Sequence, residues 1–244
     1  MKTDWLTGAA IASLAIATTT CGDTLDLVHA AIANGISSQD VDEETPSEPV
    51  EQSGFYLGGG VGVNLMSDIT VNGTANNLKM AAGVDSSVSV GYQFVEWFSV
   101  EAESGVVWNE GRDLPSGLTM NLYQVPIMAN ANFTIPLSRP GSQRWPFIGV
   151  TAYLDFKVGI GTEWTRFNWK ASGNKTNTSD WAFAYQVGTD LRLGLTSNFD
   201  LGVYFRFRGT TKVAMSNQVI AGVGGIDAKE LLNYALGMNF RVTF

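Results

Sequence analysis

The sequence predicts an all-β fold, an eight-stranded antiparallel up-and-down transmembrane β-barrel. Eight segments between residues 54 and 244 alternate apolar and polar side chains, which is the period of two expected of β-strands. One face of these segments is apolar, while Gly, Asn and charged residues gather on the other, as lipid outside and a polar lumen inside require. Short and long connections alternate along the chain, as they do in up-and-down membrane barrels.

The last strand shows this pattern most clearly. Its polar face carries Asn239, Arg241 and Thr243. Its other face is entirely apolar or aromatic and is expected to point toward lipid. The residues on that face are Tyr234, Leu236, Met238, Phe240, Val242 and Phe244.

The predicted strands have lengths close to the roughly 9–11 residues that a transmembrane strand needs. Pro126 lies inside the fourth, so it must fall at a bulge or at a missing ladder hydrogen bond. Long connections are expected at residues 66–85, 109–117, 160–180 and 208–230. The strands are Phe55–Leu65, Ser86–Phe94, Phe98–Trp108, Tyr123–Ile135, Pro146–Val158, Ala182–Leu195, Asp200–Phe207 and Tyr234–Phe244.

Three regions are predicted along the chain. Residues 1–20 have the short apolar stretch and small-residue cleavage site of a signal peptide. Residues 21–53 are acidic and poor in large apolar side chains, which predicts a disordered periplasmic linker. Residues 54–244 form the barrel, in which 14 acidic residues balance 14 basic ones, so the net charge of −8 comes from the N-terminal part. Cys21 is either lipidated or an unpaired leader cysteine.

The residue inventory excludes several kinds of chemistry in residues 54–244. The single Cys and the single His, Cys21 and His29, both precede this region. Ser-His hydrolysis, His-metal sites and His general bases are therefore excluded there. The absence of a basic patch argues against nucleic acid as a partner. We expect no catalytic, cofactor or metal site, and no enzyme.

Charged residues of both signs fall on the inward face and are expected to pair as a structural network in a closed lumen. An eight-stranded barrel is just wide enough for its side chains to fill it, and unpaired buried charges are unfavourable. A narrow gated ion path is an alternative, and a catalytic carboxylate pair at Glu101 and Glu103 is another. The predicted network comprises Glu101, Glu103, Asp155, Lys157, Asp190, Arg192, Arg206 and Arg241.

Aromatic residues cluster in the predicted connections and near the strand ends. Trp164, Phe167, Trp169 and Trp181 fall in or beside the predicted 160–180 connection. They either contact a partner at the surface or form the aromatic girdle at the outer interface. A second girdle is expected at the opposite interface from Trp97, Phe98, Trp145, Phe199 and Phe244.

Several short motifs together resemble the OmpA-like superfamily of small outer-membrane β-barrels, the group with OmpX- and Opa-type proteins. The motifs are Phe55–Val63, Leu122–Met128, Pro146–Val150, Phe183–Gly188 and Phe240–Phe244. The chain end also resembles the signal read by the barrel-assembly machinery, with Gly237, Phe240, Val242 and Phe244 at matching places.

The resemblance implies a bacterial outer-membrane protein, exported through the periplasm, with its long loops outside the cell. Its implied role is structural or surface-interacting and non-enzymatic. The implied partners are outer-membrane lipid, the assembly machinery during biogenesis and a loop partner of unknown identity. A narrow channel for ions or small molecules is the alternative function. A soluble lipocalin-type barrel would require the opposite pattern, with apolar side chains inside.

Overall fold

The computed structural model describes residues 53–69, 78–114, 116–138, 151–171, 174–211, 213–214, 227–228 and 230–244. They all belong to one compact unit, residues 51–244. No helix long and apolar enough to cross a membrane occurs among them. The long strands are β1 (Gly54–Met66), β3 (Gly83–Val95), β4 (Phe98–Arg112), β5 (Leu118–Ser138), β6 (Thr151–Ala171), β7 (Asn174–Gly194), β8 (Phe199–Thr210) and β11 (Leu232–Thr243). Three two-residue strands accompany them: β2 (Lys79–Met80), β9 (Val213–Ala214) and β10 (Asp227–Ala228).

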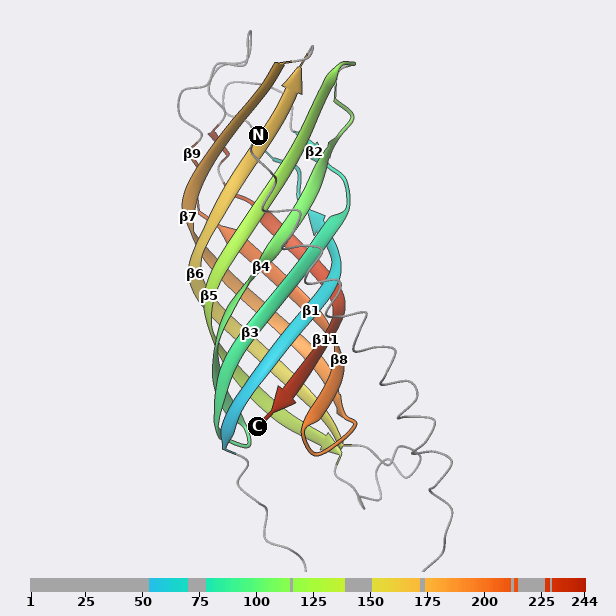
Figure 1. Cartoon of the computed structure of the whole chain (residues 1–244), viewed down its shortest axis with the longest axis vertical. Coiled ribbons are helices and arrows are strands. Elements are labelled where there is room, and N and C mark those ends of the chain that lie inside the picture. The colour runs from blue at the N-terminus through green and yellow to red at the C-terminus, as the bar shows by residue number, and fades with distance from the viewer. Residues whose placement is uncertain are drawn as a thin grey trace, which may run out of the picture. The chain divides into compact units, whose positions relative to one another are not determined.

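The eight long strands close into an antiparallel barrel, which confirms the predicted fold class (Figure 1). Their order is β4-β3-β1-β11-β8-β7-β6-β5, and a further pairing between β4 and β5 closes the ring. The first and last strands pair over much of their length, from Tyr56 opposite Thr243 to Met66 opposite Asn233. Closure gives every long strand a neighbour on both sides, which hydrocarbon requires because it offers the backbone no hydrogen-bond partners.

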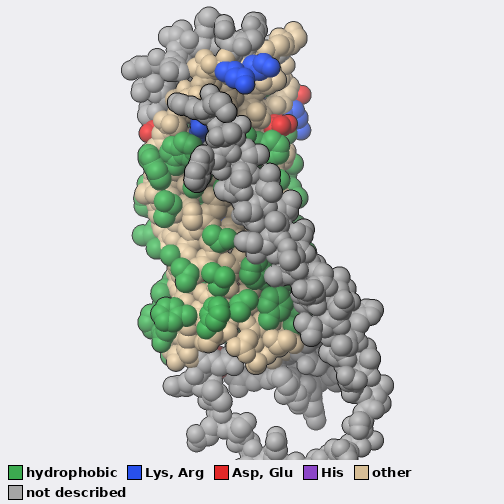
Figure 2. All heavy atoms as spheres, viewed as in Figure 1, with side chains coloured by type: hydrophobic (Ala, Val, Ile, Leu, Met, Phe, Trp, Pro, Cys, Tyr) green, Lys and Arg blue, Asp and Glu red, His purple; other side chains and the backbone are tan. Residues whose placement is uncertain are grey.

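The alternation of side chains separates the two faces of the wall as predicted. Outward residues such as Leu236 and Ile160 are 64% and 62% exposed, whereas inward Tyr204 is 1% exposed. Figure 2 shows the apolar side chains gathered over the lower and middle parts of the wall, with charged ones toward the top. The wall therefore carries a band of apolar side chains where lipid would contact it.

Strands β5, β6 and β7 extend well beyond their neighbours at the end of the barrel opposite the C-terminus, here called the distal end (Figure 1). The prediction of a connection at 160–180 was wrong, because β6 and β7 remain paired from Thr151 opposite Gly194 to Ala171 opposite Asn174. The apolar outward pattern ends near Trp164, but the backbone pairing continues. Residues 146–150 of the predicted fifth strand lie outside the described residues.

Pro126 occupies a gap in the β4–β5 ladder, as its missing N–H requires. Pairing is present at Ser104 opposite Ile127 and at Val107 opposite Gln124, and is missing between them. The Ser104 hydroxyl donates a 2.9 Å hydrogen bond to the Pro126 carbonyl and bridges the gap. On its other side Pro126 pairs with Glu163 of β6.

Two directly paired glycines make room for an inward aromatic ring. Gly62 of β1 lies opposite Gly237 of β11. A Cβ at Gly62 would lie 2.7 Å from the Tyr204 hydroxyl oxygen, and one at Gly237 would lie 2.8 Å from its ring. The Tyr204 hydroxyl donates to Asp85 Oδ1 at 3.1 Å. The glycines thus allow Tyr204 to lie flat against the seam where the barrel closes.

Candidate functional site

The predicted charged residues all lie on the inward side of long strands. They come from β4 (Glu101, Glu103), β6 (Asp155, Lys157), β7 (Asp190, Arg192), β8 (Arg206) and β11 (Arg241). Six of these side chains contact an oppositely charged partner in the described structure. Asp190 and Arg241 have no oppositely charged group within 4 Å among the described residues.

One ion-pair group lies toward the C-terminal end of the lumen. The Arg192 guanidinium contacts Asp155 and Asp200 at the same time. The Thr134 hydroxyl donates to Asp155 Oδ1 at 2.5 Å, and the Tyr153 ring centre lies 5.3 Å from Arg192 Cζ. A bidentate guanidinium with two carboxylates fixes the spacing of β6, β7 and β8 at this level.

A second ion-pair group is centred on Glu103. Lys157 Nζ lies 2.5 Å from Glu101 Oε1 and 3.2 Å from Glu103 Oε2. Arg206 Nη1 lies 2.9 Å from Glu103 Oε1, and Arg208 Nη2 lies 3.4 Å from the same oxygen. Three cations from β6 and β8 therefore meet a carboxylate from β4 across the lumen.

Asp85 and Arg208 complete this group. Arg208 is one of the inward charges that the sequence predicts, next to Arg206 in the alternation, whereas Asp85 was missed. Arg206 Nη1 and Arg208 Nη1 lie 3.4 and 3.7 Å from the two Asp85 oxygens. The predicted second strand began at Ser86 and so left Asp85 in a connection. Asp85 nevertheless lies two and four residues before inward Ser87 and Ser89. This alternation could have predicted that Asp85 also faces the lumen.

Arg241 is held by an aromatic ring and an amide. Its Cζ lies 3.6 Å from the centre of the Tyr56 ring, and its Nη2 donates to Gln93 Oε1 at 2.5 Å. The Tyr56 hydroxyl in turn donates to Glu101 Oε2 at 3.1 Å. A cation above an aromatic face is attracted by the ring's quadrupole, so Arg241 joins the network through Tyr56.

The charged side chains help to line a partly open cavity of about 50 Å³, whose lining includes Lys157, Asp190, Arg206 and Arg241. This volume suits a small number of water molecules. No cluster of His, Cys, Asp or Glu arranged to hold a metal ion occurs within the described ranges.

A layer of uncharged polar groups and one carboxylate lies beyond the ion pairs. Asn64 Nδ2 donates to Asn109 Oδ1 at 2.8 Å and to Asn233 Oδ1 at 2.9 Å. Gln124 Nε2 donates to Glu163 Oε1 at 2.5 Å. Glu163 is fully buried and was missed because the predicted fifth strand ended at Val158. Its separation from Lys157 by an even number of residues was the available signal.

An apolar cluster, here called the distal cap, fills the distal end of the barrel. Phe167 and Trp169 are 1% and 5% exposed and stack with ring centres 6.4 Å apart. The prediction that these two residues belong to a loop or a membrane girdle was wrong. The cap also contains Met66, Ile69, Met80, Met120, Leu122, Ala182, Val213, Ala228 and Leu231.

The side-chain pattern of the wall reverses at the level where Trp164 pairs with Trp181. Before that level on β6, outward Phe156, Val158 and Ile160 are exposed. Beyond it on β6 the inward residues are Thr165 and then the apolar Phe167 and Trp169, and the outward ones are Arg166, Asn168 and Lys170. Polar outside and apolar inside is the arrangement that water favours. Trp is enriched at membrane interfaces, so the Trp164–Trp181 pair marks the distal limit of the lipid-facing band.

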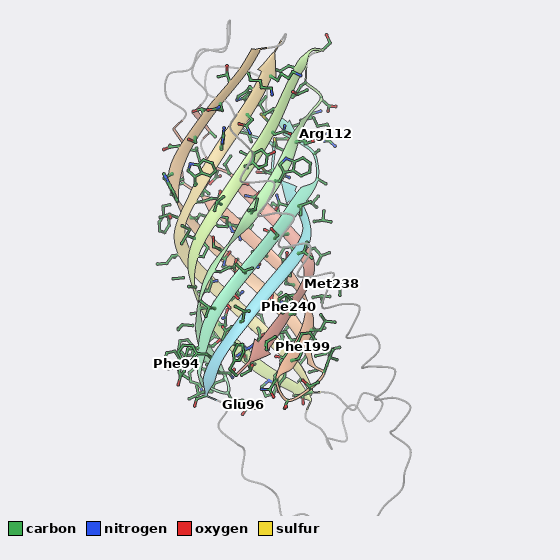
Figure 3. The ribbon with its side chains drawn as sticks, viewed as in Figure 1. Phe94, Glu96, Arg112, Phe199, Met238 and Phe240 are labelled. Carbon is green, nitrogen blue, oxygen red and sulfur yellow. The ribbon has the colours of Figure 1, made fainter. Side chains whose placement is uncertain are left out.

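The opposite end of the barrel carries the other aromatic group. Figure 3 places Phe94 and Phe199 near this end, with Glu96 in the adjacent turn, and Arg112 toward the distal end. Trp97 and Phe244 of the predicted girdle are 58% and 77% exposed, and Phe98 stacks on Phe94 with ring centres 6.0 Å apart. Trp145 lies outside the described residues.

Residues 30–243 match the family model described as the outer membrane protein beta-barrel domain. The chain therefore belongs to this family, and its location is the bacterial outer membrane. No curated protein matches the sequence.

Solved structures of small outer-membrane proteins resemble the chain. Neisserial surface protein A is 18% identical, with 79% of this chain and 98% of that chain covered and a TM-score of 0.47. Ail, the attachment invasion locus protein of Yersinia pestis, is 12% identical, with 78% and 99% covered and a TM-score of 0.45. OprG from Pseudomonas aeruginosa is 14% identical, with 78% and 96% covered and a TM-score of 0.40.

We predict that Lys157→Met strongly destabilises the barrel. The substitution leaves Glu101 and Glu103 in the lumen without their shared cation, and breaking a buried ion pair in this way costs about 3–5 kcal/mol. The measurement is the urea dependence of unfolding of the refolded protein in lipid vesicles.

Lys79→Met is the matched control, because it breaks an exposed 3.2 Å pair with Asp113 that is worth less than about 1 kcal/mol. Equal effects of the two substitutions would contradict a stabilising role for the lumen network.

Proposed function

We propose that this protein is a non-enzymatic outer-membrane barrel with a closed, ion-paired lumen. Its role is to strengthen the outer membrane and to present its distal end to molecules outside the cell. The main observations in support are the paired charges and polar groups inside the barrel and the distal cap beyond them. In the described part of the chain, this filling favours a closed lumen over a substrate cleft or an aqueous path.

The positions of the inward carboxylates favour a structural role over catalysis. Glu101 and Glu103 are 8% and 3% exposed, and both face Lys157. A substrate would have to displace these ion pairs to reach either carboxylate. The geometry therefore favours a network that holds β4, β6 and β8 together.

The same filling argues against the alternative of a narrow channel. The cavity within the charged layer holds about 50 Å³, and the distal cap lies between it and the outside. Phe167 and Leu122 in that cap are almost completely buried. An ion would need both the cap and the Glu103 ion pairs to open, and a permanently open eight-stranded pore is not expected.

The C-terminal strand supports a second proposal, that the barrel-assembly machinery reads β11 during biogenesis. Gly237 has a separate structural purpose, because its missing side chain accommodates Tyr204. Phe240 packs its ring where a Cβ at Gly59 would lie. Phe244 differs from both, since it is 77% exposed at the end of the strand. A substitution at Phe244 can therefore test recognition by the assembly machinery without disturbing the packing of the barrel.

We predict that the purified protein gives no discrete conductance steps in planar bilayers in molar KCl. The closed lumen is the physical reason, and single-channel recording is the measurement. Each sample should first show heat-dependent migration on SDS gels, which establishes that it is folded. Reproducible steps whose ion selectivity changes in Lys157→Gln would contradict the closed lumen and favour the channel.

We predict that Phe244→Ala lowers the amount of folded protein in the outer membrane several-fold without changing the thermal stability of the purified barrel. Leu236→Ala is the matched control, because Leu236 lies on the same outward face and is 64% exposed. Quantitative gels of outer membranes measure assembly, and heat-dependent migration measures stability. Equal membrane levels for the two variants would overturn the proposed recognition of Phe244.

A further inference from the structure

The outward side of β5, β6 and β7 beyond the Trp164–Trp181 pair forms a polar, basic surface, here called the distal face. It is defined by Thr119, Arg166, Asn168, Lys170, Lys175 and Asn177. The strand register sets these residues in three rows, with Arg166 opposite Tyr123 and Ser179. Asn168 lies opposite Asn177, and Lys170 lies opposite both Lys175 and Thr119. On β5, β6 and β7 these rows contain no acidic residue, and Glu110 of the neighbouring β4 lies opposite Asn121 at their edge.

The cations of the distal face form no ion pairs with the residues that the structure describes. Lys170 and Lys175 are exposed and directly opposite each other, an arrangement in which like charges destabilise a strand pair. Arg166 Nε donates to Asn168 Oδ1 at 3.1 Å. No carboxylate lies within 4 Å of these three cations in the described part of the chain. By contrast, Lys79 and Arg112 lie 3.2 and 3.8 Å from Asp113.

The height of the distal face matches the headgroup region of the outer leaflet. Arg166 follows Trp164 by two positions and Lys170 follows it by six. With a rise of about 3.3 Å per residue and a strand tilt of about 45°, these cations lie ~5 and ~14 Å beyond the interfacial aromatic pair. This range is deeper than one layer of phosphates and suits a headgroup with several sugar units.

We propose that the distal face binds the phosphorylated saccharide headgroup of an outer-leaflet glycolipid. Arg166, Lys170 and Lys175 form charge-assisted hydrogen bonds with phosphate oxygens, while Asn168, Asn177 and Thr119 bond sugar hydroxyl groups. A bound phosphate also relieves the repulsion between Lys170 and Lys175. The proposal rests on the proposed function in one respect, that the distal end faces outside the cell.

The test is a titration of the refolded full chain in detergent micelles with diphosphorylated lipid A, compared with enzymatically dephosphorylated lipid A. A near-surface cation contributes about a fivefold change in affinity. The distal-face variant K170Q/K175Q should therefore weaken binding of the phosphorylated lipid by about twentyfold, and adding R166Q should bring the loss to about a hundredfold. The conservative variant K170R/K175R should keep most of the affinity.

The matched control is K79Q/R112Q, which removes the same number of charges beside Asp113 and should change binding less than about twofold. Thermal stability without lipid gives a second readout. It should be unchanged or raised in K170Q/K175Q because repulsion is removed, whereas a merely structural role would lower it. Heat-dependent gel migration shows that each variant is folded, and the single variant K175Q replaces the double one if folding fails.

Three results would overturn the proposal. They are equal affinity for phosphorylated and dephosphorylated lipid, equal losses in K170Q/K175Q and K79Q/R112Q, and complete competition by inositol hexaphosphate at the concentration of the lipid. The last result would assign the site to a soluble polyanion. Binding in micelles does not depend on which side of the membrane the distal end faces, and bilayer conductance does not depend on the distal face. The failure of this proposal is therefore distinguishable from the failure of the proposed function.

Discussion

The absence of hydrogen-bond partners for the backbone in hydrocarbon is the constraint on which this structure depends. It requires a closed ladder, and pairing of β4 with β5 and of β1 with β11 closes it. A gap lies at Pro126, where the Ser104 hydroxyl donates a hydrogen bond to the carbonyl left without a ladder partner. Closure with eight strands then leaves an interior that side chains can fill, and the properties of the lumen follow from how they fill it.

The interior changes character along the barrel axis because its surroundings change. Where lipid covers the wall, polar side chains face the lumen because hydrocarbon cannot solvate them. There Glu103 forms ion pairs with Lys157, Arg206 and Arg208. Beyond the Trp164–Trp181 level the outward side chains of β6 are polar, as contact with water favours, and apolar side chains such as Phe167 point inward into the distal cap. The continuous pairing of β6 with β7 thus runs through the membrane barrel and on into an extension with a polar outer surface. The extension holds the inward distal cap and bears the basic distal face.

The sequence alone predicts the strands and the facing of their side chains, because both follow from alternation with a period of two. It predicts few of the contacts between residues that are distant in the chain. The eight strands and the facing of residues such as Tyr204, Glu103 and Leu236 follow from alternation. The true length of β6 does not follow from it, because the outward positions stop being apolar beyond Trp164 while the backbone pairing continues. Phe167 and Trp169 were therefore assigned to a loop. Pairing across the lumen, such as Arg241 on Tyr56, depends on strand tilt and register, which no local pattern contains.

The most direct test of this account is a spin-label accessibility scan of outward positions on β6, in a Cys21→Ser background that removes the chain's only cysteine. Labels placed singly from Phe156 to Lys170 at every second residue would be measured in lipid vesicles with oxygen and with a water-soluble nickel complex. The account predicts that oxygen dominates at Phe156, Val158 and Ile160, and that nickel dominates from Arg166 onward. Nickel access at Val158, or oxygen dominance persisting to Lys170, would contradict a lipid boundary at the tryptophan pair.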